Sequence, residues 1–293
     1  MKLVFLCGGI GKRMFPLTED KFLFKFLGKT LLQHQIEIAQ KAGLKDFVMI
    51  GNEFNMKKIK EICNQTNANV EFALQKEPKG MADALLSGKK FLMKEQILIV
   101  NPNDVFDVSA YKKIIKEAKK GDHGSYIIGY EVGSYFPGGY LEVNNKNELI
   151  RIHEKPGEGN EPSNLVNIVI HLHKNTKILF DYLEKTKSTR DDVYERALTD
   201  MVKDKRKIKV VKYKGFWQAI KYPWDIFKVT KYFLDSITRK FSLNTKISKS
   251  AMIYGNVVIE DGVKISAHSY TPLDSALKKE QIYLGHPAKI KKS

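Results

Sequence analysis

The sequence has few cysteines and no long apolar run, and these two absences exclude several classes of protein. Its only cysteines, Cys7 and Cys63, show neither a pairing pattern nor the spacing of metal ligands, which favours a reducing compartment over a disulfide-stabilised secreted fold. No stretch approaches the roughly 20 apolar residues that cross a bilayer, and the apolar start at residues 1–7 is too short for a signal peptide. We therefore expect a cytoplasmic protein without a membrane partner.

Acidic residues are scarce relative to basic ones: 33 Asp and Glu stand against 50 Lys and Arg, and the formal net charge is +17. The basic residues are spread along the chain rather than gathered in an arm, and no nucleic-acid-binding motif accompanies them. We therefore expect no nucleic-acid partner, only a positive field that helps to attract phosphates. A length of 293 residues, 43% of them hydrophobic, suits one large domain plus a small one, or two domains.

Apolar strands alternate with amphipathic helices through the first 120 residues. The pattern predicts strands at residues 1–7, 46–52, 70–75 and 96–101 and helices at 29–42, 57–66 and 81–93. This order is typical of a parallel sheet with helices on both faces. Antiparallel strands are predicted in the later pieces 126–132, 139–145, 148–154 and 164–173. Helices at 190–204 and 223–238 and a strand at 207–213 then complete the expected domain, an α/β Rossmann-like fold over residues 1–238.

The tail, residues 239–293, has a different pattern. Isoleucine recurs every six residues, and a small or aliphatic residue stands two positions before each later isoleucine; the members are Ile247, Ile253, Ile259 and Ile265 with Ala251, Val257 and Val263. A period of six is typical of a β-helix whose short strands stack and bury the repeated positions. So few coils are too short to be stable alone, so we expect the tail to dock on a second copy, making a homo-oligomer, or on its own α/β domain.

A glycine-rich loop, GGIGKR at residues 8–13, follows the first predicted strand. Glycines allow the backbone to approach a ligand with its N–H groups directed at it, and the adjacent Lys12 and Arg13 suggest an anionic ligand. The spacing is neither the dinucleotide fingerprint nor a P-loop. By itself this stretch is equally compatible with a tight turn and a solvated arginine.

Further stretches in a fixed order carry a resemblance to a known family. They read QKEPKGMADAL (75–85), IVNPNDVFD (99–107), GGYLEV (138–143), HEKP (153–156), SNLVNIVI (163–170) and GFWQAIKYPWDIF (215–227). With the glycine loop and Lys21, they resemble the sugar-1-phosphate nucleotidyltransferases, glucose-1-phosphate thymidylyltransferases among them, from Met1 to about Leu234. The hexapeptide tail with GHPAK (285–289) is frequent in the same group, where it forms a left-handed β-helix, and we expect one here.

The resemblance implies a reaction that joins the oxygen of a sugar-1-phosphate to the α-phosphorus of a nucleoside triphosphate and releases pyrophosphate. The protein must align two anions and offset the charge on phosphorus. The implied catalytic residues are Arg13, Lys21 and Asp104, the last of which would hold Mg²⁺. The implied nucleotide-binding residues are Leu6, Gly8, Gly9, Gly11, Lys12, Gln75 and Gly80, and the implied sugar-phosphate-binding residues are Gly139, Glu154, Lys155 and Asn167. We expect glucose-1-phosphate with dTTP or UTP as the substrates.

The chain departs from the family at its closing segment. The family usually reads W-x-D-x-G-T, whose aspartate is a second metal ligand, whereas this chain has Ala219 at the aspartate and Lys221 at the glycine. One hypothesis is that Lys221 supplies positive charge near the phosphates. The alternative function is a non-catalytic regulatory or assembly subunit that binds a nucleotide or a sugar nucleotide. An acyltransferase tail is disfavoured, because the hexads make little more than one turn of a β-helix.

Overall fold

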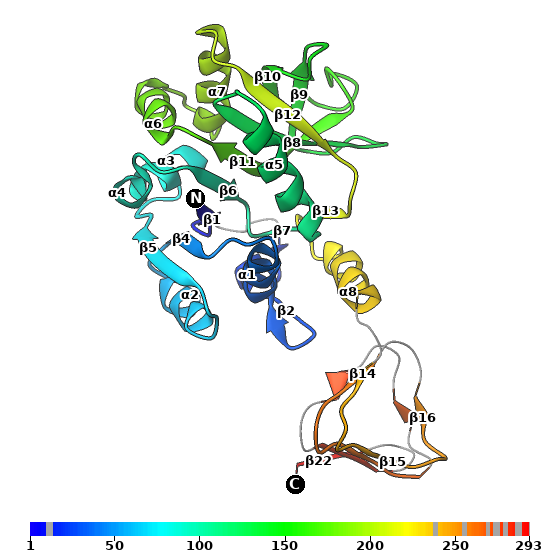
Figure 1. Cartoon of the computed structure of the whole chain (residues 1–293). Helices are drawn as coiled ribbons and strands as arrows, with labels where there is room; N and C mark the ends of the chain where they lie inside the picture. Colours follow the sequence, from blue (N-terminus) through cyan, green and yellow to red (C-terminus); the bar gives the residue numbers. More distant parts are fainter. Residues whose placement is uncertain are drawn as a thin grey trace. The chain divides into compact units, whose positions relative to one another are not determined.

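The computed structural model describes residues 1–9, 14–236, 240–253, 257–267, 270–271, 276–277, 281–284 and 289–292 (Figure 1). The chain divides into two compact units. The first unit contains Met1–Phe24 and Thr30–Lys221, and the second contains Lys25–Lys29 and Tyr222–Ser293. The domain boundary expected at residue 238 stays a prediction. No helix in the described ranges is long and apolar enough to cross a membrane.

A nine-stranded sheet forms the centre of the first unit. Strands β1, β4, β5 and β6 are parallel neighbours, and β8 is parallel to β12. Strand β11 is antiparallel to β6, β8 and β9, and β10 is antiparallel to β9, so seven of the nine strands point one way. The strands are β1 (Lys2–Leu6), β4 (Asp46–Gly51), β5 (Asn69–Leu74), β6 (Ile97–Val100), β8 (Ser125–Glu131), β9 (Gly139–Val143), β10 (Leu149–Glu154), β11 (Leu165–His173) and β12 (Ile208–Tyr213).

Helices cover both faces of this sheet. The helices are α1 (Leu31–Lys41), α2 (Met56–Cys63), α3 (Met81–Ser87), α4 (Lys89–Leu92), α5 (Val108–Lys120), α6 (Thr176–Lys185) and α7 (Val193–Lys203). Alternate residues of a strand point to opposite faces: Leu3 and Phe5 belong to a core with α1, α2 and α5, whereas Val4 belongs to a core with α3, α4, α6 and α7. Figure 1 shows the two groups of helices around the strands. The expected α/β fold with a mostly parallel sheet flanked by helices is confirmed.

Local sequence explains where helices begin and where one expected helix breaks. Thr30 starts α1 with a capping box, because its side chain accepts from the Gln33 backbone while the Gln33 side chain accepts from the Thr30 backbone. The single helix expected over 81–93 is two helices, separated at Gly88. Helices α5 and α6 were not predicted from the sequence, although Asp107 and Asn175 cap their first turns.

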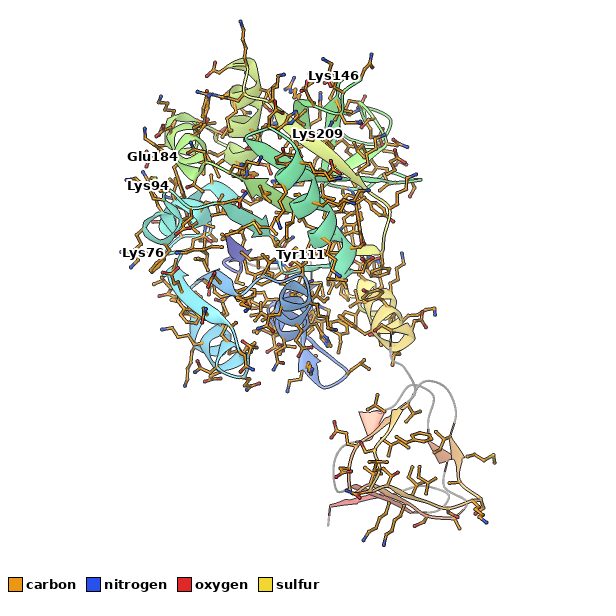
Figure 2. The ribbon with its side chains drawn as sticks, viewed as in Figure 1. Lys76, Lys94, Tyr111, Lys146, Glu184 and Lys209 are labelled. Carbon is orange, nitrogen blue, oxygen red and sulfur yellow. The ribbon has the colours of Figure 1, made fainter. Side chains whose placement is uncertain are left out.

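Shorter elements complete the first unit. Lys21–Leu23 form a 3₁₀ helix, and β7 (Asp104–Phe106) pairs with β13 (Trp217–Ala219) as an antiparallel ribbon. Basic side chains lie on the outside: Figure 2 shows Lys76, Lys94 and Lys146 at the margin of this unit. This agrees with the sequence, in which positive charge is not gathered into one segment.

The second unit contains β2 (Lys25–Phe26), α8 (Asp225–Asp235) and the tail. The Phe26 ring packs against the Phe233 ring of α8, with 5.4 Å between centroids. The strands are β14 (Lys240–Phe241), β15 (Lys246–Ile247), β16 (Met252–Ile253), β17 (Val258–Ile259), β18 (Lys264–Ile265), β19 (Tyr270–Thr271), β20 (Ala276–Leu277), β21 (Gln281–Leu284) and β22 (Lys289–Lys292); β3 (Lys29–Thr30) lies at the division between the units.

Short parallel strands stack in the tail with a constant spacing. Ile247 pairs with Ile265 and Ile259 with Leu277, so partners lie three six-residue repeats apart. All seven positions of the predicted repeat belong to one apolar cluster, in which Val257, Ile259, Val263 and Ile265 are buried and Ile247, Ala251 and Ile253 are partly buried. The six-residue period therefore marks the buried face of the tail. Its left-handedness stays a prediction.

Candidate functional site

One cavity of about 490 Å³ in the first unit collects the side chains and backbone of distant segments. Ten of the residues singled out from the sequence line it: Leu6, Gly8, Gly9, Gln75, Gly80, Asp104, Gly139, Glu154, Lys155 and Asn167. Strands β1, β5 and β6 end at this cavity, as expected for a ligand site in an open α/β sheet. Of the other expected residues, Lys21 lies beside the cavity, and Gly11, Lys12 and Arg13 lie outside the described residues.

At the end of β5, Gln75 connects the glycine loop to the turn before α3. The Gln75 Nε2 donates to the Gly80 carbonyl at 3.2 Å and to Asp83 Oδ2 at 2.8 Å. A Cβ atom at Gly8 would lie 1.9 Å from Gln75 Oε1, so a larger residue there would displace the Gln75 carboxamide. The buried Gln75 carboxamide thus has protein partners of its own. Reading of a base by this amide, as inferred from the sequence, stays a prediction.

Gly80 is required for two independent reasons. Its φ of +91° lies in the left-handed region that favours glycine. In addition, a Cβ atom there would lie 1.9 Å from Asp191 Oδ1. The backbone of Gly80 therefore lies directly against the carboxylate of Asp191, and a side chain at position 80 would fill the space between them.

Asp104 lies at the start of β7 and is only 7% exposed. Its two carboxylate oxygens accept from Asn101 Nδ2 at 3.3 Å and Trp217 Nε1 at 3.4 Å. Burial raises the pKa of Asp104 to about 6, although the Trp217 hydrogen bond and the ammonium groups of Lys221 and Lys21 act to lower it. The Lys21 Nζ also donates to the Ile220 carbonyl at 2.7 Å, so Lys21 is held close to this segment.

The β7–β13 ribbon places Ala219 directly opposite Asp104. A methyl group therefore stands where the family pattern has a second carboxylate. Two residues further on, Lys221 lines the cavity, and its Nζ lies 3.6 Å from the centroid of the Phe136 ring. The same Nζ donates to the Pro137 carbonyl. Phe136 and Pro137, in the loop before β9, thus hold the Lys221 ammonium group in the cavity, where it acts on the Asp104 carboxylate.

Gly139, Glu154 and Asn167 meet at one end of the cavity. A Cβ atom at Gly139 would lie 3.0 Å from Glu154 Oε2 and 3.5 Å from the Asn167 Cβ. Strand β10 ends at Glu154, whose Oε1 lies 3.2 Å from the Lys155 Nζ in an ion pair. This end therefore combines carboxylate, ammonium and amide groups, which suit the hydroxyl and phosphate oxygens of a sugar phosphate.

Two acidic residues of this cavity were not identified from the sequence. Asp191 precedes α7 and Glu195 lies in its first turn, and both line the cavity. Burial first, and then the nearby Glu154 carboxylate, raises the pKa of Glu195 to about 8. The pair of aspartates before an amphipathic helix was visible in the sequence, but nothing local indicated that α7 packs beside β10.

The comparisons with known proteins agree with this geometry. A family profile described as "Nucleotidyl transferase" matches residues 2–235. The chain is 31% identical over 271 residues to the "Bifunctional protein GlmU" of Methanococcus maripaludis, covering 90% of this chain and 62% of that protein. It is 34% identical over 281 residues to the "Bifunctional sugar-1-phosphate nucleotidylyltransferase/acetyltransferase" of Sulfurisphaera tokodaii, covering 92% and 64%. The chain belongs to the nucleotidyl transferase family.

Solved structures of low sequence identity share the fold. A UDP-glucose pyrophosphorylase complexed with UDP-glucose is 20% identical and superposes with a TM-score of 0.67, over 80% of this chain and 98% of the other. The family assignment confirms the resemblance drawn from the motifs. This chain spans less than two thirds of the two bifunctional relatives, so it corresponds to a part of their length.

Asp104 and Asp107 follow the same strand but have different surroundings, and this difference gives a test. Asp107 does not line the cavity; it accepts from the backbone of Ser109 and from the Tyr213 hydroxyl. We expect Asp104→Asn to lower kcat/KM for nucleotidyl transfer by at least about 100-fold, the size typical of removing one group that stabilises the transition state. Asp107→Asn should leave activity within about 3-fold and cost about 1 kcal/mol of unfolding free energy, because the amide keeps one oxygen for the helix cap but loses the oxygen that accepts from Tyr213 and Phe216.

The pH dependence separates the two variants further. Partial burial acts to raise the pKa of Asp107, but its hydrogen bonds from Ser109, Tyr213 and Phe216 outweigh burial and hold it below its usual value. A carboxyl with a depressed pKa stabilises the fold above its unfolded-state pKa and loses this effect as pH falls. Urea unfolding at pH 7 and pH 3 should therefore show a smaller deficit for Asp107→Asn at pH 3. Equal loss of activity in both variants would contradict the assignment of Asp104.

Proposed function

We propose that the protein is a sugar-1-phosphate nucleotidyltransferase that joins a nucleoside triphosphate to a hexose-1-phosphate and releases pyrophosphate. The observation that carries this proposal is one cavity whose lining includes ten residues of the family motifs, drawn from six separate segments of the chain. The cavity volume of about 490 Å³ lies within the range of small-molecule pockets, roughly 300–1,000 Å³. UTP or dTTP with glucose-1-phosphate are the favoured substrates.

In this proposal the chain aligns the two substrates and offsets charge. The backbone of Gly8 and Gly9, with Arg13, would hold the triphosphate, while Lys21 would contact the α-phosphate. Glu154, Lys155 and Asn167 would hold the sugar phosphate so that its oxygen faces the α-phosphorus. Alignment of this kind supplies much of the rate enhancement of phosphoryl-type transfers.

The residues around Asp104 fit Mg²⁺ that is held mainly by the substrate. Nucleotidyltransferases of this family typically use Mg²⁺. No group of three or more His, Cys, Asp or Glu side chains that could hold a metal exists among the described residues, and Ala219 offers no ligand atom. Mg²⁺ is often bound by one or two carboxylates together with substrate phosphates, and Asp104 provides one. When bound, the ion would neutralise negative charge on the phosphates.

A second candidate function is a non-catalytic subunit that binds a nucleotide or a sugar nucleotide. Ala219 favours this alternative, because a binding module does not need the second metal ligand. Pyrophosphate release separates the two functions when it is measured with Mg²⁺ for UTP, dTTP, ATP, GTP and CTP against glucose-1-phosphate and N-acetylglucosamine-1-phosphate. Release with at least one pair supports the enzyme, whereas nucleotide binding by calorimetry without any release supports the binding subunit.

The first variant to test is Arg13→Ala. Arg13 is expected in the glycine loop, where its guanidinium would neutralise the triphosphate, so its loss should reduce pyrophosphate release by about 100-fold or more. Arg151→Ala is the matched control, since Arg151 is an exposed arginine of β10. The thermal unfolding of both variants should match the parent. Near-normal activity of Arg13→Ala would show that the loop does not hold the triphosphate.

We propose that Lys221 adds positive charge near the phosphates. This charge would compensate for weaker metal binding, because Ala219 stands where the family has a second metal-binding aspartate. We expect Lys221→Ala to lower kcat/KM by about 10- to 100-fold, as for a lost charged hydrogen bond. We also expect the parent to keep measurable activity at very low free Mg²⁺, which Lys221→Ala should lose. The double variant Ala219→Asp, Lys221→Gly restores the family pattern and should depend strictly on Mg²⁺. Strict dependence in the parent, unchanged by Lys221→Ala, would contradict the proposal.

For the tail we propose a short left-handed β-helix that mediates self-association into a homo-oligomer. A stack of so few coils leaves strand edges and apolar residues at its open end, and pairing of two such ends covers both. Deletion of residues 239–293 should reduce the number of subunits in the particle, which light scattering gives as its mass divided by the mass of one chain. Most of the activity should remain. Ile259→Asp, which puts a charge into the apolar cluster of the tail, should do the same in the full chain. An unchanged number of subunits in both variants would show that the tail does not mediate self-association and docks on its own chain.

A further inference from the structure

Two buried histidines and a buried tyrosine form a continuous chain of hydrogen bonds that begins at Asn167 in the cavity lining. His171 Nε2 lies 2.8 Å from Asn167 Oδ1, and His171 Nδ1 lies 2.8 Å from the Tyr194 hydroxyl. The same hydroxyl lies 2.9 Å from His173 Nε2, and His173 Nδ1 lies 2.8 Å from Ser125 Oγ. Both histidines are fully buried and Tyr194 is 1% exposed. We call these five residues the Asn167 relay.

Three elements of the fold contribute to the Asn167 relay. Asn167, His171 and His173 lie on β11, Ser125 begins β8, and Tyr194 lies in the first turn of α7. The β11–β8 ladder has a bulge between Ile168 and His171. A bulge shifts the register of a strand and redirects its side chains, and here both histidines reach the α7 hydroxyl while Asn167 reaches the cavity.

Neutral rings allow two opposite directions for the hydrogen bonds of the relay, and the Asn167 Oδ1 at its end selects one of them. Burial lowers the pKa of both His171 and His173 to about 3, so both rings are neutral at pH 7. A neutral imidazole has one donor and one acceptor nitrogen. Because Asn167 Oδ1 can only accept, the His171 Nε2 must donate to it, and the His171 Nδ1 must then accept.

The remaining steps of the relay are determined in turn. The Tyr194 hydroxyl donates its single proton to His171 Nδ1, so its oxygen accepts from His173 Nε2. With its proton on Nε2, His173 accepts at Nδ1 from the Ser125 hydroxyl. Every polar hydrogen in the buried chain thus has a partner, which is the condition for a stable buried network.

The end of the relay determines what Asn167 can offer to a ligand. With Oδ1 bound to His171, the Nδ2 amino group is the part of the side chain that remains for the cavity, and no described residue of the protein accepts from it. Glu154, on the other side of Gly139, offers carboxylate oxygens. The sugar end therefore offers an amide donor from Asn167 on one side of Gly139 and, on the other side, a carboxylate acceptor that is paired with the Lys155 ammonium.

We propose that the Asn167 relay fixes the amino group of Asn167 toward the cavity, so that the sugar-1-phosphate presents a hydrogen-bond acceptor to it, and that Tyr194 is the positioning residue on which this orientation depends. This proposal rests on the proposed function for the identity of the ligand but not for the orientation of the relay. A ring hydroxyl oxygen or the carbonyl oxygen of an N-acetyl group meets this requirement.

The orientation of the relay is tested without any substrate. Long-range ¹H–¹⁵N correlation spectra of the full chain, uniformly labelled and recorded at pH 6 and pH 8, report which nitrogen of each histidine carries the proton. We expect two rings that stay neutral at both pH values with the proton on Nε2, and we expect Tyr194→Phe to remove this preference at His171. A proton on Nδ1 of His171 would reverse the relay, turn the Asn167 carbonyl oxygen toward the cavity and overturn the proposal.

The kinetic test compares two buried tyrosines. Tyr194→Phe removes the hydroxyl of the relay, whereas Tyr111→Phe removes a buried hydroxyl of α5, labelled in Figure 2, for which no described residue is a hydrogen-bond partner. We expect Tyr194→Phe to raise the KM for the sugar-1-phosphate about 10-fold, with the KM for the triphosphate and kcat unchanged. Tyr111→Phe should change none of these constants.

The outcomes separate the relay from the function proposed for the cavity. Equal KM values for the sugar-1-phosphate in the parent and in a Tyr194→Phe variant that unfolds at the same temperature would overturn the positioning role. Absence of turnover with every substrate pair would contradict the proposed function, while the histidine spectra would still decide the orientation of Asn167. A rise of both KM values together would indicate general damage to the cavity and would also count against the positioning role.

Discussion

The pairing of β11 with three neighbours is the constraint on which the rest of the first unit depends. β8 pairs along one edge of β11, while β6 and β9 pair with the later and earlier residues of its other edge. β11 therefore joins the parallel strands β5, β4, β1 and β6 to β9 and β10, which carry Gly139 and Glu154. Because Ile170 pairs with Val100 at the end of β6, Asn167 lies beyond the end of β6 and beside Asn101 and Asp104, whose segment follows that strand. This pairing therefore brings Asn167 to the same cavity as the residues that follow β1, β5 and β6.

The same strand brings buried polar groups into the interior, and these groups are stabilised only because they satisfy one another. His171 and His173 replace apolar side chains on a face that otherwise packs against α6 and α7. An unpaired buried polar group costs about 1–3 kcal/mol, so the Tyr194 hydroxyl, which lies within hydrogen-bond distance of both rings, contributes to the stability of the fold. The relay thus couples packing of α7 on the sheet to the chemistry of the cavity.

Strand periodicity and short ordered motifs are local signals, and they predict most strands and helices of the first unit and ten of the residues that line the cavity. The orientation of side chains in the cavity depends on contacts between distant segments and was not predictable. Gln75 was expected to face a base, yet its amide is held by Gly80 and Asp83. Asp191 and Glu195 were missed for the same reason, since only the packing of α7 brings them to the cavity. Helix α5 was not predicted, although the sequence places Asp107, a favourable N-cap residue, immediately before it.

The distribution of charge around Asp104 bears on the choice between an enzyme and a binding subunit. The family pattern of two aspartates, one divalent cation and one lysine has a sum of one positive charge. Asp104, Lys21 and Lys221 together have the same sum without any ion, and both lysines act on the Asp104 carboxylate. Ala219 removes one negative charge of the family pattern and Lys221 adds one positive charge. Counted without the divalent cation, these two changes together keep the net charge of the site at one positive charge. A charge balance that suits bound phosphates favours continued use of the cavity for a phosphate-bearing ligand, and the alignment of sugar and nucleotide ends around it favours transfer between the two.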